Sequence, residues 1–185
     1  MPAQTTRAVA SGDVTISGPN GYCIDRSSAR DGADGAFLFF SPCTQSLAAS
    51  ETTPDVPPVL LTALVSTPLP EGSRATPADL DRYLRSNAGR AVLAQDGDPK
   101  SATILITQTR GDVLYLRVRD TSNSQSGPLA TDAWRAVFPV NGRIVALSAK
   151  ALAEQPVASS SALSVLRQFV DSTTAANTEP EATSA

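Results

Sequence analysis

The chain has 185 residues, a formal net charge of −3 and no histidine. Histidine is the commonest general base and the commonest metal ligand, so its absence excludes Ser-His-Asp and Cys-His catalysis within this chain and leaves a structural zinc site short of ligands. Charge is spread without a basic block, and no apolar run approaches the ~20 residues that cross a bilayer. We therefore expect neither a nucleic-acid partner nor a membrane span.

Both ends of the chain are rich in small and polar residues. Such composition predicts disorder over residues 1–11 and 175–185, and a single domain over residues 12–174. Ala8-Val9-Ala10 resembles the residues before a signal-peptidase cut, which indicates that a targeting segment has been removed.

The first elements are strands by their apolar pattern. Val14–Ser17 alternates, residues 18–21 (Gly-Pro-Asn-Gly) supply a turn, and Tyr22–Asp25 is predicted to return as the second strand of a hairpin. The polar residues 26–35 are predicted to form a solvated loop. Ala36–Ser41 has the length and apolar content of a buried strand.

Cys23 and Cys43 are the only cysteines. With 19 residues between them, the two cysteines do not form a CxxC motif. We therefore predict one structural disulfide rather than a redox-active pair or half of a metal site. A persistent disulfide indicates an oxidising compartment, either the periplasm or the outside of the cell. A cytoplasmic protein with two buried thiols is the alternative.

The middle of the chain contains one strand and the clearest helix start. Val59–Ser66 is predicted to be a buried strand. Thr76 can cap a helix and Pro77 suits its first position, so a helix is predicted over residues 77–88, with Gly89 as its stop signal.

The stretch from residue 101 to 151 predicts two β-hairpins, and a closing amphipathic helix follows over residues 160–171. The Asn141-Gly142 pair is the strongest short hairpin signal in the chain. The four predicted strands are Thr103–Thr109, Val113–Asp120, Thr131–Val140 and Arg143–Ala151.

Four arginines on these strands are a candidate partner-binding site. If the strands are neighbours, the four could gather on one exposed sheet face and bind an acidic partner; an ordinary solvated face is the alternative. They are Arg117, Arg119, Arg135 and Arg143.

Runs of hairpins with two amphipathic helices predict the α+β class, with a predominantly antiparallel sheet. The order of elements resembles the PsbP-like superfamily, which includes the extrinsic photosystem subunit and small bacterial envelope lipoproteins and chaperones. The resemblance rests on residues 14–24, the Thr76-Pro77 helix start, residues 138–147 and residues 166–172. It implies an α/β/α sandwich that binds other proteins and has no catalytic residues to carry over.

These observations favour a non-enzymatic, periplasmic or secreted protein-binding module with no cofactor or metal, an accessory subunit or chaperone of a cell-envelope complex. A small-ligand or lipid-binding domain is the alternative, with a cleft between helix and sheet lined by Phe37, Phe39 and Tyr115. A hydrolase using carboxylates such as Asp25 and Asp31 is a third hypothesis.

Overall fold

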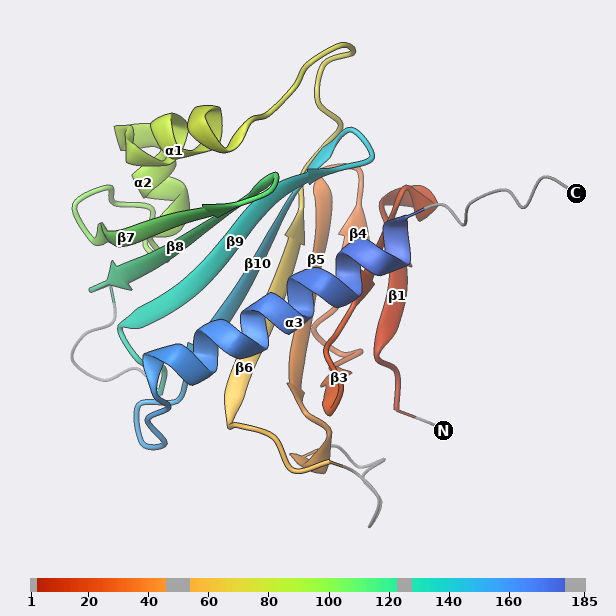
Figure 1. Cartoon of the computed structure of the whole chain (residues 1–185), viewed down its shortest axis with the longest axis vertical. Coiled ribbons are helices and arrows are strands. Elements are labelled where there is room, and N and C mark those ends of the chain that lie inside the picture. Colours follow the sequence, from red (N-terminus) through yellow and green to blue (C-terminus); the bar gives the residue numbers. More distant parts are fainter. Residues whose placement is uncertain (1–2, 46–53, 123–127, 179–185) are drawn as a thin grey trace, which may run out of the picture.

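A computed structural model describes residues 3–45, 54–122 and 128–178, and a curved, mainly antiparallel sheet is its central element (Figure 1). Within these residues the sheet has eight strands, and every pair of neighbours is antiparallel. In spatial order they are β3 (Tyr22–Ile24), β5 (Gly35–Pro42), β6 (Val59–Val65), β10 (Arg143–Ala151), β9 (Asp132–Val140), β8 (Val113–Asp120) and β7 (Ala102–Arg110), with β4 (Arg30–Gly32) paired to β5. The predicted α+β class is confirmed.

A second, two-stranded sheet is formed by β1 (Thr6–Val9) and β2 (Val14–Ser17), joined by a short 3-10 turn, η1 (Ala10–Gly12). Two predictions are therefore wrong. The strand at Val14 pairs with β1 rather than with β3, and the segment expected to be disordered over residues 1–11 contains a strand. The physical reason is burial, since Val9 and Val14 are fully covered in the core and hold both strands there.

Helix α3 (Ser159–Asn177) crosses one face of the sheet diagonally (Figure 1). The apolar stripe of α3 is buried against the sheet. Within it, the Phe169 ring packs edge-on against the Phe40 ring, with 5.0 Å between the ring centroids. The helix continues six residues beyond the predicted end at Asp171. Asn177 accepts a hydrogen bond from the Thr15 backbone N–H, which ties the last turn to β2.

Two short helices, α1 (Pro77–Arg85) and α2 (Asn87–Leu93), pack against β7 and β8 on the opposite face. The predicted capping at Thr76 is confirmed, but a single helix over residues 77–88 is wrong because the chain breaks at Ser86. Gly89, expected to stop the helix, lies inside α2. A Cβ there would be 2.1 Å from the Tyr83 carbonyl oxygen, so glycine permits the close approach of the two helices.

The β9–β10 hairpin turns through Asn141 and Gly142 at φ values of 47° and 77°. Two successive positive φ values belong to the hairpin turn that an Asn-Gly pair predicts. The short 3-10 helix η2 (Cys43–Gln45) follows β5. No helix among the described residues is long and apolar enough to cross a membrane.

Candidate functional site: the open half of the sheet

The two faces of the sheet are distinguished by strand register, because side chains paired across neighbouring strands lie on the same face. One row faces α3, and we name this the α3 face; a second row lies on the α1–α2 face. The α3-face row is Leu38, Ala63, Leu147, Ala136 and Tyr115. The α1–α2-face row is Phe37, Leu64, Ala146, Val137 and Leu114.

The α1–α2 face is covered unevenly. Leu114 on β8 packs with Leu80 and Leu84 of α1 and is 2% exposed. Leu64 on β6 belongs to the same row and is 45% exposed. The two short helices therefore cover the β7–β8 side of this face and leave the β5–β6–β10 side accessible.

We name this accessible region the open half of the sheet. Its side chains are partly or well exposed, and most of them are apolar. Its members are Phe37, Phe39, Leu60, Thr62, Leu64, Ile144, Ala146 and Ser148. At its centre Thr62 and Ser148 share a hydrogen bond, so the hydroxyls within the apolar patch satisfy each other.

The predicted ligand cleft lined by Phe37, Phe39 and Tyr115 is wrong. Phe37 and Phe39 lie on the open half, whereas Tyr115 lies on the α3 face, on the other side of the sheet. The run from Ala36 to Ser41 is predicted to be a buried strand. Only alternate positions are buried, among them Phe40, because β5 is covered on one face alone.

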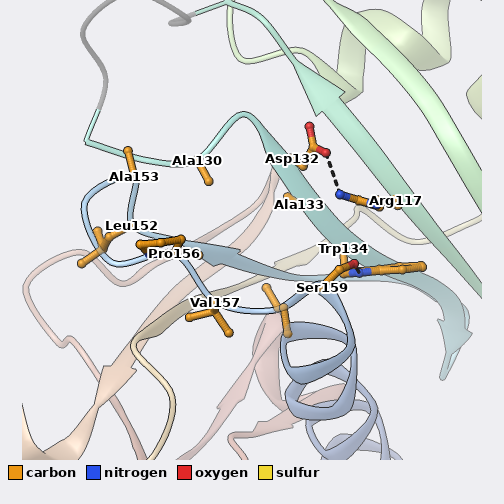
Figure 2. A pocket seen from close by; sticks show the side chains of 13 residues that line it. Arg117, Ala130, Asp132, Ala133, Trp134, Leu152, Ala153, Pro156, Val157 and Ser159 are labelled. Atoms are coloured by element: carbon orange, nitrogen blue, oxygen red, sulfur yellow. Dashed lines mark hydrogen bonds and ion pairs between the residues drawn. The ribbon is translucent and has the colours of Figure 1, made fainter.

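The four arginines do not gather on one open face. Arg117 and Arg119 lie on the α3 face and flank Asp132, each with a nitrogen 2.9 Å from one of its carboxylate oxygens. Figure 2 shows the ion pair of Arg117 with Asp132. The Arg119 hydrogen bond, and then the charges of both arginines, lower the pKa of Asp132 below its ordinary value. These two arginines are therefore already paired within the fold.

Arg143 and Arg135 are held elsewhere. Arg143 is buried, donating to the Ser66 carbonyl oxygen at 2.9 Å and to the Asp13 carboxylate at 3.1 Å. Arg135 lies on the α1–α2 face, where its Nη2 donates to the Leu93 carbonyl oxygen of α2 at 3.1 Å. Together they tie loops and helices to the sheet, so the expectation of a shared arginine face is corrected.

A polar cluster lies where α2 meets the open half. Burial would raise the pKa of Asp120, but hydrogen bonds from Ser122 and the Gln95 backbone outweigh it, and the pKa is lowered. Burial lowers the pKa of Lys150 and of Arg135. The cluster thus contains two desolvated cations and one carboxylate that is already hydrogen-bonded.

Two hollows lie on the α3 face. One, of about 160 Å³, lies beside the start of α3, where the Trp134 indole N–H donates to the Ser159 hydroxyl at 2.9 Å (Figure 2). That volume is below the ~300 Å³ at which small-molecule sites begin. The other, of about 470 Å³, is a groove between the last turns of α3 and the β7–β8 and β9–β10 turns, lined by Tyr115, Phe138 and Asp171 among others.

The predicted disulfide is confirmed. Cys23 on β3 is bonded to Cys43 in η2, with the Cα atoms 5.0 Å apart. The carboxylates proposed for hydrolysis have structural hydrogen bonds: Asp25 accepts from Ser27, and Asp31 accepts from the Ala10 backbone N–H at 2.9 Å. Among the described residues no three His, Cys, Asp or Glu side chains are grouped to hold a metal ion.

Sequence reasoning missed three residues of this region: Leu64, Lys150 and Arg30. Leu64 lies in the apolar run Val59–Val65, which has the appearance of a strand buried on both faces. The signal that could have found the open half is the lack of a predicted helix long enough to cover a second face, since α1 and α2 are short and pack mainly against β7 and β8.

No family model and no curated protein matches the chain. Among solved structures, it is similar to the solution structure of cyanobacterial PsbP (CyanoP) from Synechocystis sp. PCC 6803, at 11% identity and a TM-score of 0.48. The similarity covers 93% of this chain and 92% of that chain. The similarity concerns the arrangement of elements alone.

Proposed function

We propose that this chain is a non-enzymatic protein-binding module that works as an accessory subunit or chaperone of a complex in the periplasm or outside the cell. The observation that carries the proposal is the open half of the sheet, where apolar side chains of three neighbouring strands are accessible together. Contiguous apolar surface of this kind marks sites of protein interaction, because leaving it in water costs free energy.

The disulfide supports the proposed compartment. Cys23 and Cys43 are both buried and bonded, and such bonds persist where the surroundings are oxidising. The bond also fixes the edge strand β3 next to β5, so it supports the rigid sheet on which the open half lies.

Site-specific crosslinking in the native envelope tests this function. A photo-reactive amino acid is placed at Leu64 on the open half, or at Val92 on α2 as a control. Val92 is 63% exposed and lies outside the proposed surface. We expect one protein to crosslink from position 64 and not from position 92; equal yields from both positions would contradict the proposal.

A small-ligand domain is the second candidate, and the groove of about 470 Å³ beside α3 favours it. Its volume lies within the range of small-molecule sites, and the buried rings of Tyr115 and Phe138 lie at its base. Native mass spectrometry of the protein purified from its own cells separates the two candidates. A stoichiometric bound small molecule, lost on filling the groove with Thr174→Trp, would favour the ligand-binding function.

A further inference from the structure

The charged side chains that strand register places on this face of β4, β5, β6, β10 and β9 are all basic. Strand register places the side chains of β4, β5, β6, β10 and β9 on this face at alternate positions. The charged residues among those described positions are Arg30 at one edge and Arg135 and Lys150 at the other. An occupant that matches this border carries negative charge at two separated points.

The two cations on the β9–β10 side lack full pairing. Lys150 has no hydrogen-bond or ion-pair partner among the described residues, and the buried Nε of Arg135 has none there either. Asp120 is the acidic group facing them, and its oxygens already accept from Gln95 and Ser122. A carboxylate brought by a partner would give the partly exposed Lys150 the charge-assisted hydrogen bond that it lacks.

The dimensions of the open half fit one helix. Strands lie about 4.8 Å apart, so the outer axes of β5, β6 and β10 are separated by about 10 Å, close to the diameter of an α-helix. The opposite face of the same strands is already covered by one helix, α3, which crosses diagonally (Figure 1). A helix on the open half would complete a second layer of the same kind.

We propose that the open half binds an amphipathic helix of a partner protein that carries acidic residues toward both of its ends. This inference rests on the protein-binding function proposed above and names the chemistry of the partner. The apolar stripe of the helix packs on Phe37, Leu64 and Ile144. Its carboxylates lie against Arg30 at one end and against Lys150 at the other.

The register also sets the spacing of the acidic residues. Arg30 is in the row of Phe37, Leu64 and Ala146, and Lys150 lies four residues beyond Ala146 on β10. Three strand spacings in one direction and four residues along a strand in the other give a diagonal of about 20 Å. At 1.5 Å per residue, that diagonal corresponds to about 13 residues of helix.

A peptide selection on the intact chain tests the inference. The library consists of 20-residue helical peptides with a fixed Leu stripe, and its polar positions are randomised among Glu, Gln and Lys. We expect selection to enrich Glu near both ends, about 13 residues apart, and to fail on the Leu64→Asp variant. The best peptide should bind the Lys150→Glu and Arg30→Glu variants about tenfold more weakly. Changing the matching Glu of that peptide to Lys should restore binding to each variant.

Arg30 is exposed on the edge strand β4, so Arg30→Glu keeps the test valid if the Lys150 variant does not fold. Enrichment of neutral or basic peptides, no enrichment, or binding that survives Leu64→Asp would overturn the inference. The inference would also be overturned if the chain bound phosphatidylglycerol vesicles through Lys150 and did not bind peptide. A dimer in sedimentation that Leu64→Asp abolishes would overturn it as well. If crosslinking from position 64 succeeds while the peptide selection gives any of these results, the proposed function survives and the acidic helix does not.

Discussion

Removing the disulfide should destabilise the domain by about 3 kcal/mol. Cys23 and Cys43 are 20 residues apart, and in the chain-entropy model a loop of that length restricts the unfolded chain by this amount. The loop contains β4 and the whole of β5, so its ends must meet whenever the sheet forms. The change is the double variant Cys23→Ala/Cys43→Ala, which avoids leaving one reactive thiol.

Urea unfolding followed by tryptophan fluorescence measures the effect. Trp134 is the only tryptophan, and it is buried beside α3, so its emission reports on the core. With a urea dependence of about 2 kcal/mol per M, a loss of about 3 kcal/mol lowers the unfolding midpoint by about 1.5 M.

The matched control is the wild-type chain in a reducing agent, which breaks the same bond without changing a side chain. Both proteins should show nearly the same midpoint. A shift below about 0.3 M in the double variant, or a large shift in the double variant with none in the reduced wild type, would refute the chain-entropy reasoning.

Three further predictions concern packing and charge. Phe40→Ala should lower the free energy of unfolding in urea by about 3–5 kcal/mol, because it removes the buried contact with Phe169. Phe37→Ala on the open half should lower it by about 1 kcal/mol. Similar losses for the two variants would contradict the assignment of the two faces. Gly89→Ala should lower the free energy of unfolding by about 2 kcal/mol or more, since the added Cβ would collide with the backbone of α1. An unchanged melting temperature would show that the two helices can separate freely. Asp132→Asn should cost about 1 kcal/mol at pH 7. Because the folded-state pKa of Asp132 is lowered, the difference in unfolding free energy between wild type and variant should be constant above about pH 5 and should disappear as the pH falls below about 4. A difference that persists at pH 2.5 would contradict the ion pairs.

Most of the sheet could be predicted from the sequence because local signals and tertiary structure agree there. The Asn141-Gly142 turn imposes positive φ values that only a few residue pairs adopt easily, and the strands on either side alternate. The capping residues before Pro77 likewise satisfy the first backbone N–H groups of α1 through contacts within four residues. The disulfide could be predicted because the chain has only two cysteines.

The errors lie where long-range pairing decides the outcome. Val14–Ser17 has the pattern of a strand, but nothing within the strand specifies whether its partner precedes or follows it. Gly89 is a frequent helix stop in general, and its role here depends on the approach of a second helix. The arginines were grouped on one face because strand register, which separates Arg135 from Arg117, is a property of the paired sheet.

The affinity of the partner captured from position 64 for two matched variants tests the central claim most directly. Leu64→Asp places a charge within the open half, and Val92→Asp places the same charge on exposed surface of α2. If the open half is the binding surface, the dissociation constant should rise at least about tenfold for Leu64→Asp and less than about twofold for Val92→Asp. Equal effects, or a larger loss for Val92→Asp, would show that the partner binds elsewhere on the fold.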